Sequence, residues 1–282
     1  MSRLAAIAVR SAERAIPLLP AAADAVIATV AGTLAYRLSP GARAAVRANL
    51  GVIAPERRDR ERLVRATFIA QVRHYLEIFR LARLDPGKVL REIRVIGWDE
   101  FVATHARGRG VIIASAHLGP VSVCGQVLVL NGYPATLPIE RETSELASAI
   151  NRARTAMGLR FVQTDSALGI RRVLRQGGVL GILADRAVTG VGERVPFFGR
   201  EALLPSAHVA LALRTGAPVI PAFARREGGT ICAIFEPELH LRRTDDHAAD
   251  IRDGVRRFAA ILERQIRAVP DQWSVFEPVW DR

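Results

Sequence analysis

The chain has 282 residues, of which 50% are apolar and 24% are charged. This length and composition allow a substantial buried core in one large or two small domains. They exclude intrinsic disorder, a collagen-like repeat and a coiled coil as descriptions of the whole chain. The 40 basic residues outnumber the 28 acidic ones, for a net charge of +12, which favours acidic partners such as nucleic acid or an anionic membrane surface.

Most of the excess positive charge lies in the first 110 residues, which carry a net charge of +9. Within this region the stretch 15–36 is apolar, and Asp24 is its only charged residue. Pro17 and Pro20 make the stretch a poor membrane span, and the late start of the apolar run makes it a poor signal peptide. We therefore predict that residues 1–40 form a helix that associates with a membrane surface; an alanine-rich core helix is the alternative.

The remaining residues, 41–282, are predicted to form a single α/β domain. Up to residue 107 helical patterns dominate, with helices expected over 42–50, 59–84 and 97–107 and a strand over 93–96. Further strands are expected at 111–116, 135–139, 160–163, 179–184, 219–225 and 230–235, the last two as a hairpin. Further helices are expected at 121–130, 144–157, 166–175, 205–215 and 247–268. This alternation predicts a central mixed sheet flanked by helices.

Polar side chains follow two of the predicted strands directly. His117 comes after the strand 111–116, and Asp185 and Arg186 come after the strand 179–184. Ligands of α/β proteins collect beyond the carboxyl ends of strands, and a histidine there is well placed to act as a general base near neutral pH. A helix-capping histidine and a structural Asp185–Arg186 pair are the alternatives.

The motifs that are absent narrow the choice of chemistry. The sequence contains no GxGxxG after a strand, no GxxxxGK[ST], no HExxH and no GxSxG. This disfavours hydride transfer, P-loop phosphoryl transfer and a serine-hydrolase elbow. Cys124 and Cys232 form no metal-binding spacing, so no metal site is expected. The basic segment lacks interleaved aromatic residues, so no nucleic-acid partner is expected either.

Five segments carry a family resemblance. They are RAAVRANL at 43–50, HYLEIFRLARL at 74–84, RGVIIASAHLGP at 109–120, GVLGILADRAVTGVGERVPFFGREALLPSAHVALALRTGAPVIPAFARR at 178–226 and IRAVPDQW at 266–273. In order and spacing they resemble the late acyltransferases of lipid A biosynthesis and the related phosphatidylinositol mannoside acyltransferase. The resemblance implies a glycerolipid-acyltransferase-like fold. It also implies transfer of a fatty acyl group from an acyl thioester to a hydroxyl of a membrane lipid or glycolipid.

The resemblance also implies the partners of the chain. The acyl donor would be acyl carrier protein or acyl-CoA, and the acceptor a lipid or glycolipid at an anionic membrane surface. The expected place is the cytoplasmic face of the bacterial inner membrane, as a peripheral protein or with a single N-terminal anchor. Apart from the acyl thioester, which is a co-substrate, no cofactor and no metal are expected.

The active-site motif of that family is a histidine followed, after four residues, by Asp or Glu. The histidine takes the proton of the attacking hydroxyl, and the carboxylate orients the imidazole. His117 matches the first position, but Ser122 stands in the second. Three explanations are open. In the first, Asp185, or failing that Glu201, supplies the carboxylate. In the second, His117 acts alone on a reactive acceptor such as an amine. In the third, the chain has lost transfer activity and keeps a binding role. The alternative functions are therefore transfer of a carrier-bound acyl group to a small soluble metabolite, and lipid binding without catalysis.

Other positions match the family pattern in part. Arg154 resembles an arginine near the acyl-acceptor cleft, with an exposed helix arginine as the alternative. Arg200, in a predicted loop, is expected to meet phosphate or an oxyanion. The predicted catalytic residues are therefore His117 and Asp185, and the predicted substrate contacts are Ser122, Arg154, Arg186, Arg200 and Glu201. Core or interfacial anchoring is expected of Trp273, Phe276 and Trp280.

Overall fold

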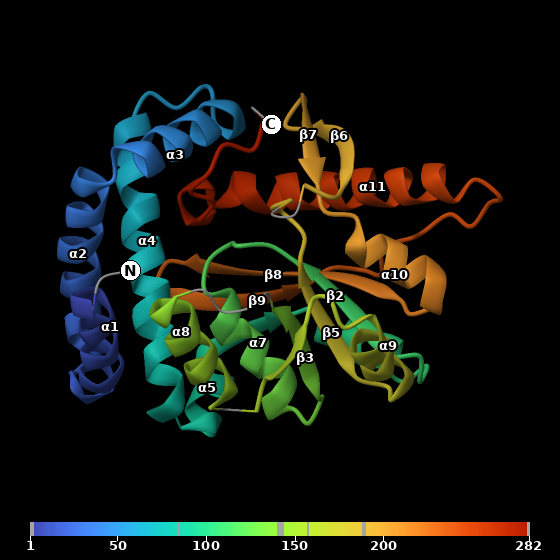
Figure 1. The fold of residues 1–282 in the computed structure, drawn as a ribbon, viewed down its shortest axis with the longest axis horizontal. Coiled ribbons are helices and arrows are strands. Elements are labelled where there is room, and N and C mark those ends of the chain that lie inside the picture. The colour runs from blue at the N-terminus through green and yellow to red at the C-terminus, as the bar shows by residue number, and fades with distance from the viewer. Residues whose placement is uncertain (1–2, 84, 140–143, 157, 188–189, 281–282) are drawn as a thin grey trace.

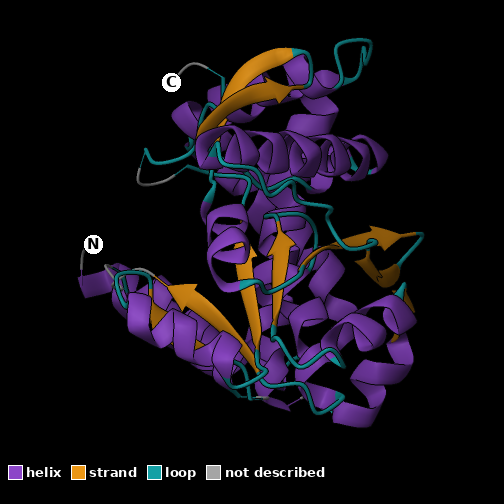
Figure 2. Ribbon diagram, turned by 90° about the vertical axis from the view of Figure 1, so that its right-hand side faces the viewer, coloured by secondary structure: helices purple, strands orange, loops and turns teal. Residues whose placement is uncertain are grey.

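The computed structural model describes residues 3–83, 85–139, 144–156, 158–187 and 190–280. Seven strands form one sheet in the order β1-β9-β8-β2-β5-β3-β4, and β6 and β7 form a separate hairpin. Neighbours in the sheet run parallel except β8 and β9, which are antiparallel. The predicted mixed sheet flanked by helices is confirmed (Figure 1, Figure 2).

The described helices and strands have the following bounds. The helices are α1 Arg3–Ala15, α2 Asp24–Leu38, α3 Pro40–Ile53, α4 Arg60–Arg80, α5 Pro86–Glu92, α6 Trp98–His105, α7 Val121–Leu130, α8 Glu145–Thr155, α9 Ala167–Arg175, α10 Ala207–Thr215 and α11 His247–Ala268. The strands are β1 Ile93–Ile96, β2 Val111–Ser115, β3 Ala135–Ile139, β4 Arg160–Gln163, β5 Val179–Leu183, β6 Glu193–Phe197, β7 Arg200–Leu204, β8 Val219–Glu227 and β9 Thr230–Phe235.

The central strand β2 shows why the sheet needs helices on both faces. All five of its residues are buried. Alternate side chains of a strand point to opposite faces. Accordingly, Ile112 and Ala114 join the cluster that includes side chains of α3, α10 and α11, whereas Val111 and Ile113 join the cluster that includes side chains of α5, α6 and α7. A strand that is buried on both faces has a continuous run of apolar residues, and this run predicts β2 from the sequence.

The N-terminal region is not one continuous helix, which corrects the prediction of a helix over residues 1–40. Helix α1 ends at Ala15, two short 3-10 turns contain or follow Pro17 and Pro20, and α2 starts at Asp24. Proline lacks the backbone N–H that an α-helix needs and clashes with the preceding turn, which accounts for the break. Ala21–Leu38 is the one described helical stretch long and apolar enough to cross a membrane, and 11% of it is buried.

Helix α2 lies against α4, at the left edge of Figure 1. The two backbones approach closely at Gly32, where an added Cβ would lie 2.6 Å from the Cα of Ile69. The ion pair between Asp24 and Arg80, at 2.6 Å, closes the same interface, and both side chains are largely buried. A larger residue at position 32 would therefore separate α2 from the body of the protein.

The hairpin β6–β7 lies where the sequence predicts a loop. Its two-residue turn consists of Phe198 and Gly199, with φ of +53° and +74°. Positive φ at both positions is typical of a type I′ turn. The usual sequence of such a turn is Asn-Gly, so Phe-Gly does not predict it. The turn packs against α11, where the Phe198 N–H donates to Glu263 Oε1 at 2.6 Å and Arg267 lies over the Phe198 ring.

Candidate active site

His117 and Asp185 meet beyond the ends of two paired strands. The last residues of β2 and β5, Ser115 and Leu183, are partners in the parallel ladder. His117 and Asp185 each come two residues later, so the register brings them side by side. The distance between His117 Nδ1 and Asp185 Oδ1 is 2.9 Å, and the backbone N–H of His117 donates to Asp185 Oδ2 at 2.9 Å.

Asp185 is fully buried and accepts a third hydrogen bond. The donor is Trp273 Nε1–H, at 2.9 Å from Oδ2. Burial by itself raises the pKa of the Asp185 carboxyl, but the charge and hydrogen bonds of His117, with the bond from Trp273, outweigh it. The net result is a pKa below its ordinary value. Asp185 is therefore ionised at neutral pH, and it fixes the histidine tautomer that carries hydrogen on Nδ1.

The segment around Trp273 also holds the backbone of the histidine loop. The Ser274 N–H donates to the His117 carbonyl at 2.8 Å, and the Gly119 N–H donates to the Gln272 carbonyl at 3.0 Å. Gly119 has a φ of +54°, and an added Cβ would lie 2.7 Å from the carbonyl oxygen of Ala224. A residue with a side chain at position 119 would thus be strained and would push the loop away from β8.

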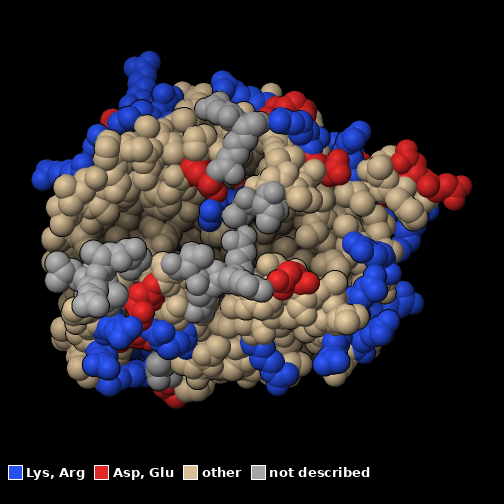
Figure 3. All heavy atoms as spheres, viewed as in Figure 1, with Lys and Arg blue, Asp and Glu red and all other residues tan. Residues whose placement is uncertain are grey.

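Two cavities meet at His117, whose side chain is 31% exposed. The larger, of about 630 Å³, is mainly apolar and lies between α7 and the sheet. Its apolar lining includes Val121, Cys124, Leu128, Leu137, Leu159 and Phe235. Because Nδ1 faces Asp185, the other ring nitrogen, Nε2, is the one left to accept a proton from a bound molecule. Figure 3 shows a hollow to the left of the middle of this face, bordered mainly by uncharged side chains, with most arginine and lysine side chains nearer the outer edge of the molecule.

The smaller cavity, of about 390 Å³, is lined by more polar side chains. Among them are Gln71, His74, Tyr75, Ser274 and Glu277. The residues common to both cavities are His117, Val121, Ala147, Asn151, Arg154 and Arg186. His117 is therefore open to an apolar cavity on one side and to a polar cavity on the other.

Ser122, in the first turn of α7, is buried and bonded to neighbours other than His117. Arg154 Nε–H donates to its hydroxyl oxygen at 3.0 Å, and His74 Nε2 lies 3.3 Å from that oxygen. Burial and the nearby charge of Arg154 lower the pKa of His74 to about 3, so its ring is neutral. Burial also lowers the pKa of Arg154 to about 10, which leaves its guanidinium charged at neutral pH.

The structure gathers five of the seven predicted site residues around the two cavities. His117, Arg154 and Arg186 line both cavities, Ser122 lines the apolar one, and Asp185 lies directly behind His117. Arg186 forms an ion pair with Glu277 at 2.6 Å.

Arg200 and Glu201 do not lie at either cavity, contrary to their expected position beside the cleft. They stand exposed on β7, in register with Phe197 and Pro196 of the hairpin. The reason is the unforeseen hairpin turn, which folds this segment against α11.

Three further residues of the site are not among the predicted site residues. The sequence predicts no role for His74 or Glu277, and it predicts only anchoring for Trp273, which is also a hydrogen-bond donor to Asp185. His74 and Trp273 lie inside the segments HYLEIFRLARL and IRAVPDQW, so the family resemblance was the available signal. Within the described parts of the chain, no three His, Cys, Asp or Glu side chains are grouped so as to hold a metal ion.

Comparisons with known proteins give the family of the chain. Residues 4–282 match the family model described as bacterial lipid A biosynthesis acyltransferase. The phosphatidylinositol mannoside acyltransferase of Mycolicibacterium smegmatis is 28% identical over 77% of this chain and 72% of its own length. That of Mycobacterium tuberculosis strain H37Rv is 28% identical over 74% of this chain and 67% of its own length. The chain is an acyltransferase that acts on a lipid or glycolipid, and it belongs to the bacterial lipid A biosynthesis acyltransferase family.

Proposed function

We propose that the chain transfers a fatty acyl group from an acyl thioester, on acyl carrier protein or coenzyme A, to a hydroxyl of a membrane glycolipid, with His117 as the general base. The observation that carries this proposal is the position of His117 between an apolar and a polar cavity. The apolar cavity suits a fatty acyl chain, and the polar cavity suits the headgroup of an acceptor. The reacting carbonyl and hydroxyl would then meet at Nε2.

The His117 tautomer with hydrogen on Nδ1 leaves Nε2 free to act as the base in the reaction. Nε2 takes the proton of the acceptor hydroxyl while its oxygen attacks the thioester carbonyl, which forms the new C–O bond and a tetrahedral intermediate. The C–S bond then breaks, and the imidazolium returns the proton to the leaving sulfur. Asp185 stabilises the positive imidazolium through its bond to Nδ1 but does not itself take the proton.

In this scheme Asp185 replaces the carboxylate that the family motif has at the position of Ser122. Its two bonds to His117 support this first explanation over a histidine acting alone. Glu201 is a poor partner for His117, since it is exposed on the hairpin. The lipid-binding alternative without catalysis has less support, because the Asp185 carboxylate orients His117, and His117 is open to both cavities.

The names of the similar proteins guide the choice of acceptor. Both mycobacterial relatives are named as acyltransferases of phosphatidylinositol mannoside. A mannosylated phosphatidylinositol is therefore the acceptor that we propose to test first, with lipid A as the second.

Membrane association is proposed from the exposed face of α2. Val26, Val30, Leu34 and Leu38 are each at least 53% exposed and lie four residues apart. This spacing places them on one stripe, opposite the face that packs on α4 through Ala28 and Gly32. An exposed apolar stripe with the exposed Arg37 near its C-terminal end suits the surface of an anionic membrane, and we propose that this membrane is the inner membrane, at its cytoplasmic face.

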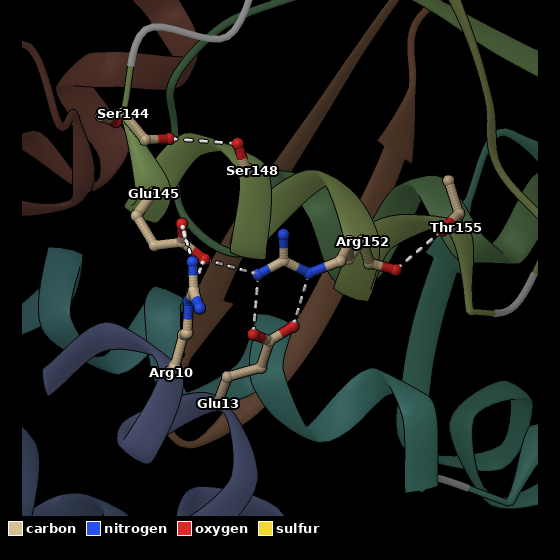
Figure 4. A network of polar contacts seen from close by, with 7 residues as sticks. All are labelled: Arg10, Glu13, Ser144, Glu145, Ser148, Arg152 and Thr155. Carbon is tan, nitrogen blue, oxygen red and sulfur yellow. Dashed lines mark hydrogen bonds and ion pairs between the residues drawn. The ribbon is translucent and has the colours of Figure 1, made fainter. Parts of the chain in front are cut away.

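Helix α1 connects this region to the cavity wall. Arg10 pairs with Glu145 at 3.2 Å and Glu13 pairs with Arg152 at 2.8 Å, which ties α1 to α8 (Figure 4). Helix α8 also carries Asn151 and Arg154, which line both cavities. The N-terminal helices therefore lie next to α8, the helix past which a lipid acceptor would enter the cavities.

The test of the proposed function is intact-mass analysis of total lipids from cells with and without the gene, followed by transfer assays with the lipid that changes. An added acyl chain on a glycolipid, lost in the deletion strain and in a His117→Ala strain, is the expected result. A soluble metabolite as acceptor would leave the lipid profile unchanged, and that outcome would contradict the proposal.

A further inference from the structure

Arg154 is a partly buried cation without a carboxylate partner among the described residues. None of the described Asp or Glu side chains lies within ion-pairing distance of its guanidinium, and its one hydrogen bond to a described side chain is that from Nε to Ser122. The other cation of the polar cavity, Arg186, is balanced by Glu277 at 2.6 Å. The cavity therefore carries one positive charge that the described residues do not neutralise.

The residues beside Arg154 do not remove this charge. The Ser122 hydroxyl can accept from Arg154 and donate to His74 Nε2, and this arrangement leaves the hydrogen of His74 on Nδ1. His74 is 9% exposed, and its Nδ1 has no hydrogen-bond partner among the described residues. A buried donor without a partner costs free energy, and so does a buried charge without a counter-ion.

We infer that Arg154, with Ser122 and His74 beside it, forms a phosphate-binding subsite where the polar cavity meets the apolar one. This inference rests on the proposed function, since it assigns part of the substrate to that cavity. A carboxylate at position 122, as in the family motif, would lie beside Arg154 and neutralise it. Serine at this position leaves the guanidinium free for an anion of the substrate, and a guanidinium binds phosphate through two parallel hydrogen bonds.

The phosphate can belong to either substrate. The headgroup of an anionic acceptor lipid carries one, and so does the phosphopantetheine of the acyl donor. Both would reach the same guanidinium, because Arg154 lines the apolar and the polar cavity alike.

The first experiment measures binding of inorganic phosphate to the full chain by phosphorus NMR, at constant ionic strength and without turnover. Arg154→Gln removes the charge, and Ser122→Asp supplies an internal counter-ion. Each variant should weaken phosphate binding about 10-fold or more. The matched control is Arg214→Gln, which removes one exposed arginine on α10 and should bind phosphate like the parent.

Unchanged phosphate binding in both Arg154→Gln and Ser122→Asp, with folding verified by circular dichroism, would overturn the subsite. This result is separate from the fate of the proposed function, because phosphate binding requires no acyl transfer. Conversely, loss of transfer in His117→Ala with phosphate binding retained would support both assignments.

The second experiment identifies the source of the phosphate. Transfer is measured with acyl-CoA and with acyl-pantetheine, which lacks phosphate. If Arg154 holds the donor, Arg154→Gln should raise KM for acyl-CoA and leave KM for acyl-pantetheine unchanged. If it holds the acceptor, the variant should raise KM for the phosphate-bearing acceptor with either donor. A KM that changes for neither substrate would contradict the inference.

Discussion

His117 and Asp185 are joined by two hydrogen bonds of 2.9 Å, one from the ring and one from the backbone of the histidine. The pair is separated by 68 residues in sequence, so its geometry depends on the pairing of β2 with β5. The carboxylate thus fixes both the tautomer and the position of the imidazole, which is the arrangement that a general base needs.

Removal of either member of this pair should abolish most of the activity. His117→Ala is expected to lower kcat by about 10²–10⁴-fold, because a water molecule must then take the proton of the acceptor hydroxyl. Asp185→Asn should cost a similar factor, and the double variant should be little worse than either single one, because the two groups act as a unit. Steady-state transfer assays with folded variants measure this. Full activity in Asp185→Asn would show that His117 works without it.

Trp273 should act as a positioning residue through Asp185. Trp273→Phe keeps most of the buried ring but removes the Nε1–H donor to Oδ2. A hydrogen bond to a charged group contributes about 1.5–3 kcal/mol, so we expect kcat to fall about 10-fold. We also expect the basic group in the pH–rate profile to titrate at a changed pH, which a loss of packing alone would not produce.

The matched control for that variant is Trp280→Phe. The indole of Trp280 donates to the carbonyl of Phe197 at 3.0 Å, on the hairpin side of the molecule. The same chemical change there should alter the melting temperature but not the pH–rate profile. Equal effects of the two variants on that profile would contradict the role of Trp273.

His208 should make stability depend on pH. It is fully buried against Phe258, neither ring nitrogen has a hydrogen-bond partner among the described residues, and burial lowers its pKa from 6.5 to about 3. Between those pH values the unfolded chain binds a proton that the folded chain does not. Stability should therefore fall as the pH drops from 6.5 towards 3.

His208→Leu removes this titration and the unpaired nitrogens. We expect a higher melting temperature at neutral pH, by an amount that corresponds to about 1–3 kcal/mol, and a larger gain at pH 5. His74 titrates in the same direction, so part of the acid sensitivity should remain. Thermal melts across this pH range measure both effects. An equal gain at the two pH values would show that His208 does not contribute to the pH dependence.

The apolar stripe of α2 should bind the protein to anionic vesicles. Val26→Glu with Val30→Glu places two carboxylates on the stripe, at side chains that are 65% and 64% exposed. The variant should move largely to the supernatant in vesicle sedimentation, because burying a carboxylate at the membrane is unfavourable and the anionic surface repels it. High salt should release the parent only in part, since screening acts on the charged contribution alone.

Leu168→Glu is the control for general loss of surface hydrophobicity. Leu168 is 80% exposed on α9, away from α2 in sequence and in the fold. This variant should sediment like the parent. Release of both variants to the same extent would show that the α2 stripe is not the membrane contact.

The sequence by itself determined the class of the fold and most of its elements. Strands buried on both faces, such as β2, need continuous apolar residues, and helices such as α11 need a repeating apolar face. Both are local patterns, and the segments 121–130, 135–139 and 247–268 were predicted with the bounds that the structure has. The polar residues after β2 and β5 were equally visible, because a strand end interrupts an apolar run.

Only the tertiary structure decided which of these residues meet. The strand order places β2 beside β5, which brings Asp185 to His117, whereas the turn at Phe198 leaves Glu201 exposed on the hairpin. Trp273 reaches Asp185 from near the end of the chain, 88 residues further on. Such contacts depend on strand register and on packing between distant segments, and no local periodicity in the sequence encodes either of them.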